Sequence, residues 1–444
     1  METKKKGFPA AFWVCACTEI FERLAYYLGR SLILIFVTAS VATGGLGLSD
    51  TVAANMQSNL TAFSYLLPLF GAVIVDKYIG ARYTTPVGMF IAAAGYFTGG
   101  IAKSSAGVYA MIFLVSLGLA LFKNGAIIGR VITDKSQMDP AFSMRYTLVN
   151  VGAFIGTFLV GILYKDVFAK DGVLGFAPCF KMAALMMVLG GLWYIFVCWR
   201  FLGDLGKLPF KKTLTAEAKK KEEKGTKQPL TTIEKKRIGA IFVASLFSIV
   251  FWIFWYLGYM PVYFYWAENM DWVVAGYQVP STWFDAANSL FCVILGPVTA
   301  ALWKKLAARP QGDMSLFRKT GLGIAIIGVG YLFYAAIDIM RGGEKASVLW
   351  LIVFAFLLTM GEMFFSPLGH SFISKYSPSR YLAVMMSVWG FATFIAAKSY
   401  GRVYGLLFGG KIEFKVACIG VAVVSFAAAL IMIALDKKLS ALVD

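Results

Sequence analysis

Four ionisable side chains, Glu19, Glu22, Arg23 and Arg30, interrupt an apolar segment near the N-terminus. In the hydrocarbon core of a membrane such groups are costly, so they usually mark a water-accessible functional site. At about 100° per residue, these charges and Tyr26 fall within roughly 60° of one helix face. We therefore predict a membrane-spanning helix whose polar stripe faces a cavity, where a carboxylate can bind either a proton or Arg23. The alternative is a structural clamp, in which Glu19, Glu22 and Arg23 only neutralise one another.

Further polar side chains lie inside other apolar segments. Lys123 is positioned to bind a substrate carboxylate, or else its long side chain reaches the inner membrane interface. Glu362 has no basic residue one turn away, so it needs a partner on another helix, a substrate cation or a proton. Asp285 either caps its helix or exchanges protons, and Lys398 is expected to reach the outer interface. Asn150 supplies a neutral hydrogen-bonding group to the cavity or to a helix contact.

Composition indicates which class of protein must position these groups. The chain has 444 residues, 59% of them hydrophobic and only 15% charged, whereas a soluble protein carries about a quarter charged residues. The net charge of +18 comes from basic residues in short loops and one linker, which indicates cytoplasmic loops and not a nucleic-acid partner. The six cysteines form no CxxC pair and there is one histidine, so neither a metal site nor a cofactor is expected.

Apolar runs and their breaks predict an all-α polytopic membrane protein with twelve transmembrane helices. The predicted spans are 10–38, 52–76, 84–102, 106–132, 141–165, 178–202, 238–264, 281–307, 318–340, 347–373, 381–406 and 413–436.

The one long polar stretch divides these spans into two halves. Residues 204–236 are predicted to be a cytoplasmic linker between two six-helix bundles, residues 1–203 and 237–444. Thr231 and Glu234 form a capping-box pattern just before the seventh span. Because Lys and Arg gather in alternate connections, we expect a multi-pass protein of the cell membrane with both termini in the cytoplasm.

Glycines mark places where helices can approach closely. The stretch from Gly71 to Arg82, with Asp76, Lys77 and Gly80, resembles the loop signature of the major facilitator superfamily between spans two and three. Gly71 would allow a close helix contact and Asp76 would cap and pair at a cytoplasmic helix end. Two more pairs spaced by four residues are interpreted as packing contacts: Gly95 with Gly99, and Gly125 with Gly129.

Taken together, the polar residues resemble the proton-dependent oligopeptide transporter family, or peptide transporter family, of the major facilitator superfamily. The resemblance covers nearly the whole chain, and the ExxER motif of the first span is highly specific. The motifs that carry it are Glu19-x-x-Glu22-Arg23 followed by Tyr26-Tyr27 and Arg30, Tyr65 with Pro68, Phe122-Lys123-Asn124, Asn150-Val-Gly-Ala-Phe, Phe251-Trp252, Gly361-Glu362-x-Phe-x-Ser366-Pro367, and Met385 to Trp389.

This resemblance implies a role for each group of residues. It assigns Glu19, Glu22 and Arg23 to proton coupling and Glu362 to the amino end of a peptide. It assigns four residues to the carboxylate end of the peptide: Tyr26, Arg30, Tyr65 and Lys123. Three residues would line the pocket: Asn150, Trp252 and Trp389.

The chain also departs from the family pattern at three places. Tyr256 and Leu257 stand where members that move peptides usually carry a glutamate, often followed by glutamine. Asn124 follows the lysine of the fourth span, where the family often has proline. Asp285 stands where the family often has glutamine. The acid that usually partners Lys123 is therefore missing from the seventh span.

The expected function is a proton-coupled symporter that imports di- and tripeptides or peptide-like compounds by alternating access of its two halves. One alternative within transport is a small anion, such as nitrate or an organic acid. An alternative of another class is a membrane sensor that binds its ligand without transporting it. An enzyme is not expected, because the chain has no HExxH motif and no nucleophile elbow. The expected partners of a monomeric protein are the substrate, protons and the lipid bilayer.

Overall fold

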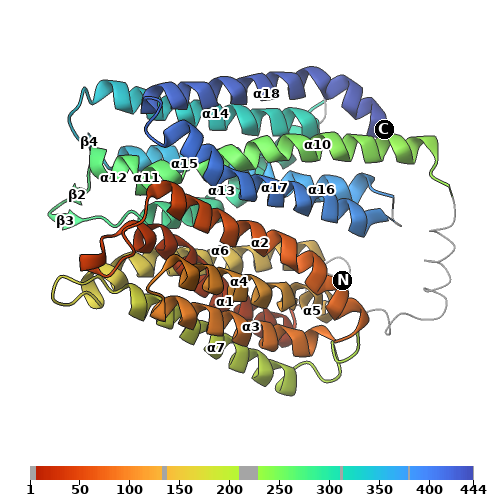
Figure 1. Ribbon diagram of the computed structural model, residues 1–444. Helices are drawn as coiled ribbons and strands as arrows, with labels where there is room; N and C mark the ends of the chain where they lie inside the picture. The colour runs from red at the N-terminus through yellow and green to blue at the C-terminus, as the bar shows by residue number, and fades with distance from the viewer. Residues whose placement is uncertain (1–6, 133–137, 210–228, 311–313, 379–380, 444) are drawn as a thin grey trace. The chain divides into compact units, whose positions relative to one another are not determined.

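The computed structural model describes residues 7–132, 138–209, 229–310, 314–378 and 381–443. The chain forms two compact units (Figure 1). Unit 1 consists of Met1–Leu48 and Leu66–Thr215, and unit 2 consists of Ser49–Tyr65 and Ala216–Asp444. The second helix is divided between the two units: its first half packs with the C-terminal helices of unit 2.

Unit 1 is built from helices that follow one another along the chain, with a π-helical turn at Leu163–Val167. Their bounds are α1 Ala10–Thr38, α2 Asp50–Lys77, α3 Ala81–Ile101, α4 Ser105–Leu121, α5 Asn124–Val131, α6 Met138–Ile162 and α7 Phe176–Arg200.

Unit 2 combines the first half of α2 with the later helices, of which α14 lies along α18 (Figure 1). The helices are α10 Thr232–Leu257, α11 Met260–Tyr263, α12 Tyr265–Asn269, α13 Trp283–Ala307, α14 Leu316–Met340, α15 Trp350–Met363, α16 Ser366–Tyr376, α17 Leu382–Phe408 and α18 Phe414–Val443. Four two-residue strands form two small ladders: β1 Met270–Asp271 parallel to β4 Ala346–Ser347, and β2 Val273–Val274 antiparallel to β3 Tyr277–Gln278. The capping box predicted for Thr231 and Glu234 is present at the start of α10.

Each of the twelve predicted spans coincides with one helix or with a broken pair. Among the described residues, seven helices are long and apolar enough to cross a membrane, and α4 and α15 are shorter apolar helices. The span predicted at 106–132 is broken between α4 and α5, where Phe122 has an extended ψ of 103°. The span predicted at 347–373 is broken between α15 and α16, where Pro367 near the start of α16 cannot donate a backbone hydrogen bond. Both breaks therefore lie inside predicted spans.

Three predictions concern residues that the structure describes only in part. The linker predicted at 204–236 includes residues 210–228, which lie outside the described residues, so its boundaries stay a prediction. The side chains of Asp76 and His370 also lie outside the described part.

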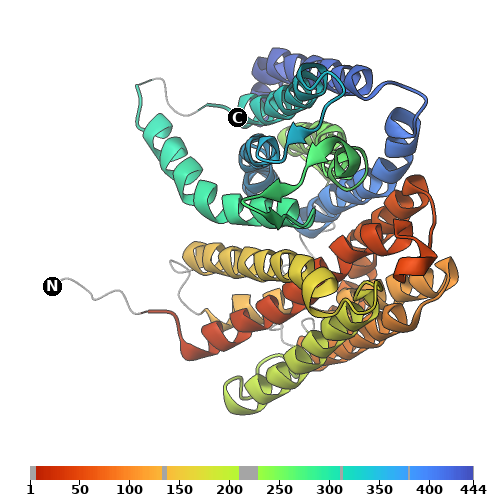
Figure 2. The ribbon, with the colours of Figure 1, turned by 90° about the vertical axis from the view of Figure 1, so that its left-hand side faces the viewer.

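Close backbone contacts determine how the polar helix α1 is held in unit 1. In Figure 2, α1 (red) lies between α6 (yellow) and α7 (yellow-green). A Cβ atom on Gly156 of α6 would overlap the carbonyl oxygen of Leu24, and one on Gly152 would lie 2.8 Å from the carbonyl oxygen of Ile20. Glycine at these two positions lets the backbones of α1 and α6 touch, so the side chains between them are held at short range.

A second close approach confirms the interpretation of Gly71. This buried glycine of α2 faces Ala120 of α4, and a Cβ atom there would overlap the Ala120 carbonyl oxygen. In the same loop signature, Arg82 donates to the carbonyl oxygens of Cys198 at 2.5 Å and of Gly203. The signature therefore joins α2 to α4 and connects the start of α3 to the end of α7.

Replacing Gly71 by alanine is expected to destabilise the protein by about 1–3 kcal/mol, because backbone atoms of α4 must move to admit the new methyl group. Thermal unfolding of the purified protein in detergent should show this as a lower midpoint. Gly239→Ala is the matched control, since nothing lies within 4 Å of a Cβ at Gly239 on α10. Equal midpoints for both variants would contradict the assigned contact.

Candidate functional site

The centre of the polar stripe is an ion pair between two consecutive residues of α1. Glu22 is completely buried, and Arg23 donates to both of its carboxylate oxygens, with Nη2 lying 2.5 Å from Oε1. The Arg23 guanidinium carbon also lies 4.7 Å from the centre of the Tyr26 ring, which gives the cation a second favourable contact. Because both partners belong to one helix, the pair can open by a side-chain rotation of Arg23 alone.

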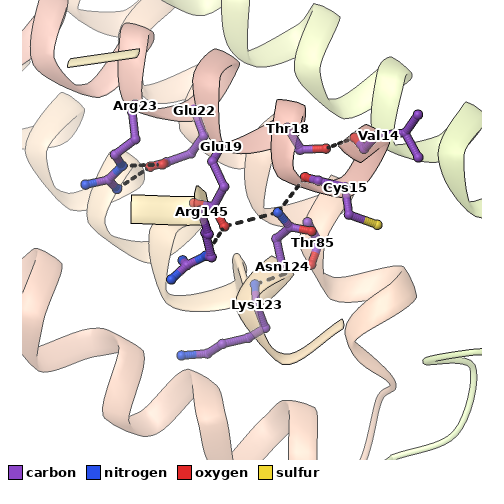
Figure 3. Close-up of polar contacts among 10 residues, drawn as sticks. All are labelled: Val14, Cys15, Thr18, Glu19, Glu22, Arg23, Thr85, Lys123, Asn124 and Arg145. Carbon is purple, nitrogen blue, oxygen red and sulfur yellow. Dashed lines mark hydrogen bonds and ion pairs between the residues drawn. The ribbon is translucent and has the colours of Figure 1, made fainter. Parts of the chain in front are cut away.

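Glu19 lies one turn earlier on α1 and has different partners (Figure 3). Its Oε1 accepts from Arg145 Nε of α6 at 2.9 Å and from Asn124 Nδ2 of α5 at 3.1 Å. Asn124 also donates to the carbonyl oxygen of Cys15 at 2.8 Å. The charge of Glu19 is therefore neutralised by Arg145 of α6. A clamp confined to α1 would have required Arg23 to neutralise it.

Arg145 is the residue of this cluster that sequence reasoning missed. It lies within the span predicted at 141–165, but basic residues near a span end are typical of the cytoplasmic flank. Its position could have indicated a role, because a charged side chain inside a predicted span needs a partner.

Lys123 occupies the break between α4 and α5. Its backbone, with φ −125° and ψ 34°, is outside the helical region, and its N–H donates to Thr85 Oγ1 at 3.3 Å. Its ammonium group donates to the carbonyl oxygen of Pro68 on α2 at 2.9 Å. The lysine is half-buried in unit 1, and its ammonium group is bound to the backbone of α2.

The remaining predicted residues of unit 1 lie on α1 and α6. Arg30 is buried, with its guanidinium carbon 5.8 Å from the centre of the Tyr27 ring. Tyr26 is buried too and packs edge-on against Tyr27. Asn150 donates to the carbonyl oxygen of Tyr146, one turn earlier on its own helix, at 3.0 Å. Unit 1 thus brings Glu19, Glu22, Arg23 and Tyr26 together on one face of α1.

In unit 2 the central acid is Glu362, near the end of α15. It is 8% exposed and accepts from Asn288 Nδ2 of α13 at 3.2 Å and from Cys292 Sγ at 3.7 Å. Within the described residues of unit 2 it has no ion-pair partner. A buried carboxylate held only by neutral donors is suited to receive a cationic group or a proton. Cys292 therefore contacts this carboxylate directly.

Asp285 and Lys398 have partners of their own in unit 2. Asp285 accepts from the hydroxyl group of Tyr263 at 2.5 Å, and the structure records no side-chain cap at the start of α13. Lys398 of α17 donates to Asn59 on the first half of α2, and its ammonium lies 5.6 Å from the Phe63 ring centre. The ammonium of Lys398 is therefore bound to the first half of α2, and its predicted reach to the outer interface stays a prediction.

Aromatic side chains form a continuous cluster in unit 2. Phe365 stacks on Trp389 with ring centres 5.8 Å apart, and it meets Trp252 edge-on at 6.3 Å. Tyr256 packs against Trp252, and its hydroxyl group donates to that of Tyr65 at 3.3 Å. Trp252 and Trp389, the pocket residues predicted for unit 2, thus both contact Phe365, and Tyr256 adds a hydroxyl group beside Trp252.

Comparison with known proteins finds similarity to transporters. A model of the POT family matches residues 206–408. The chain is 24% identical to the uncharacterized transporter YclF of Bacillus subtilis (strain 168), with 90% of this chain and 88% of that protein covered. It is 23% identical to a di-/tripeptide transporter of Lactococcus lactis subsp. cremoris, with 86% of each covered. The chain is therefore similar to POT family transporters over most of its length.

The fold agrees with that of solved POT family structures. A crystal structure of a POT family transporter in complex with 5-aminolevulinic acid has a TM-score of 0.86 to this chain, at 23% identity and with 98% of each chain covered. This similarity confirms the predicted class, an all-α membrane protein with the twelve-helix major facilitator fold. Among the described residues, no group of three or more His, Cys, Asp or Glu side chains could hold a metal ion.

Proposed function

We propose that this chain is a POT family member, a proton-coupled symporter that imports di- and tripeptides or peptide-like compounds by alternating access. The observation that carries the proposal is the ion pair on α1 between the fully buried Glu22 and the partly buried Arg23. The di-/tripeptide transporter among its relatives supports a peptide substrate. We place the protein in the cell membrane as a monomer, with both termini in the cytoplasm.

The proposed mechanism couples protonation to conformation through the polar stripe of Glu19, Glu22 and Arg23. When Glu22 binds a proton, its attraction to Arg23 is lost and the arginine is free to take another partner. A proton can drive transport only if it stabilises the outward- and inward-facing states to different extents. The exchange of Arg23 for a proton on a buried carboxylate provides such a difference.

The substrate contacts follow the charges of the two units. Lys123 and Arg30 are the proposed cations for the carboxylate end of a peptide, with Tyr26 and Tyr65 as hydroxyl donors. Glu362 is the proposed partner of the peptide amino group, because its recorded partners are neutral. Three residues are proposed to line the pocket: Asn150, Trp252 and Trp389.

Uptake into proteoliposomes tests the proposed function. An inwardly directed proton gradient should drive accumulation of a labelled dipeptide, and a proton ionophore should abolish it. Competition by unlabelled tripeptides but not by free amino acids or nitrate would support a peptide substrate. Competition by nitrate or organic acids alone would favour the anion alternative, and binding without uptake would favour a sensor.

The two buried acids of unit 2 should respond differently to neutral replacement. We expect Glu362→Gln to weaken binding of a dipeptide by about tenfold or more, because the peptide amino group loses its anionic partner. Asp285→Asn should change binding by no more than about twofold, since an amide oxygen still accepts from Tyr263. Competition binding with both variants at equal expression checks this. A transport-dead Asp285→Asn protein that expresses normally would instead make Asp285 a proton site.

A further inference from the structure

Two carboxylates lie one turn apart on α1, and they are held in different ways. Glu22 is paired with its chain neighbour Arg23, whereas Glu19 is paired with Arg145 from α6 and hydrogen-bonded by Asn124 from α5. Glu19 is only 2% exposed, so its charge depends on these partners and not on water.

The α5 residues next to the break are shaped for this pair. Asn124 is fully buried, and its amide nitrogen bridges Glu19 and the Cys15 carbonyl oxygen. Gly125 leaves the space that the Arg145 guanidinium fills: a Cβ atom at Gly125 would lie 3.2 Å from Arg145 Cζ. One turn later, a Cβ at Gly129 would meet Phe142 at an ordinary 3.6 Å. The close fit is therefore specific to Gly125.

The two pairs also differ in what must move to open them. The Glu22–Arg23 pair opens by side-chain rotation within α1. The Glu19–Arg145 pair joins α1 to α6, and the glycine contacts of Gly152 and Gly156 hold these two backbones together. Separating Glu19 from Arg145 would require the long arginine to leave a glycine-lined space while Asn124 stays bound.

We propose that Arg145 is a positioning residue that keeps Glu19 as a permanent counter-ion between α1, α5 and α6, so that Glu22 alone of the two α1 carboxylates exchanges a proton during transport. This inference rests on the proposed proton coupling and narrows it to one acid. It also explains the departure from the family pattern at Asn124, whose amide supplies a donor that proline lacks. The ionisable groups that act on Glu19 or lie next to it are Cys15 and Glu22 of α1, Tyr194 of α7, Arg145 of α6 and, at the break, Lys123.

The first test compares proton-to-substrate ratios, measured as the voltage at which net flux stops in proteoliposomes. The double variant Glu19→Gln/Arg145→Met removes both charges of the pair together. We expect its transport rate to fall but its ratio to equal that of the parent. Loss of proton-driven accumulation in the double variant, with substrate exchange retained, would show that Glu19 carries the proton and would overturn the proposal.

The second test needs no transport and reads the protonation of Glu19 directly. In Arg145→Met the buried carboxylate lacks its cation and is expected to take up a proton. Infrared spectra should then show a new protonated-carboxyl band that is absent from the parent and from Arg145→Lys, and that disappears in the double variant. No new band in a folded Arg145→Met protein would contradict the proposal.

A milder pair of variants covers the case in which Arg145→Met does not fold. Gly125→Ala should displace the guanidinium and produce a weaker form of the same infrared band, whereas Gly129→Ala should match the parent. Identical spectra for both alanine variants would contradict the fit described for Gly125. A parent protein without proton-driven uptake would refute the proposed function, while the infrared result would still decide whether Arg145 keeps Glu19 ionised.

Discussion

Glu22→Gln is expected to abolish accumulation of substrate against its gradient while exchange of substrate across the membrane continues. Glutamine has nearly the shape of glutamate and still fits the buried site, but it has no carboxylate that can bind either a proton or Arg23. Without this exchange of partners, protonation no longer changes the balance of the outward- and inward-facing states. The substrate site is left intact, so equal concentrations on both sides should still equilibrate.

Two assays on the same proteoliposomes separate these outcomes. Accumulation of a labelled dipeptide under an imposed proton gradient should fall to the level of protein-free vesicles. Counterflow, in which internal unlabelled substrate exchanges for external label, should stay within about threefold of the parent. The control is Glu234→Gln, which neutralises the partly exposed capping glutamate of α10. Undiminished uphill accumulation by Glu22→Gln would rule out the proton role of this residue.

Lys123→Ala should eliminate transport of substrates that bear a carboxylate. Lys123 lies at the break between α4 and α5 with its ammonium held by the Pro68 carbonyl oxygen, a partner that a substrate anion can readily replace. An anion left without its cation in a partly desolvated site loses several kcal/mol, or about a thousandfold in affinity.

The measurement is competition binding with a dipeptide and with its C-terminal amide. The parent should prefer the free carboxylate, and Lys123→Ala should lose that preference. Lys305→Ala removes an exposed lysine at the end of α13 and serves as the control for a general loss of positive charge. If Lys123→Ala binds the dipeptide as tightly as the parent does, the carboxylate of the dipeptide must bind another cation.

The sequence predicted the membrane spans well because each is a long apolar run, and its energetics depend mainly on local composition. The close contact at Gly71 and the capping box at Thr231 were also predictable, since both depend on one residue type at one place. The breaks at Lys123 and Phe365 were not predicted. Apolar residues continue across both positions, so hydropathy does not register a change of backbone direction.

Pairing between helices was the part of the site that the sequence could not supply. Glu22 and Arg23 are chain neighbours, so their contact follows from helix geometry alone. Arg145 lies more than a hundred residues from Glu19, and only the packing of α6 on α1 brings them together. The partner of Lys398 was not predictable for the same reason, because Asn59 lies on the first half of α2.

The two helix breaks have a consequence for how cargo selectivity can change over evolutionary time. The backbone N–H groups at both breaks have partners: those of Phe122, Phe364 and Phe365 donate to carbonyl oxygens three or four residues earlier, and that of Lys123 donates to the Thr85 hydroxyl group. Every residue except proline carries such an N–H group, so these bonds do not depend on which side chain stands at the break. Side chains at the breaks can therefore change, and with them the preference for a cargo, while the course of the backbone persists.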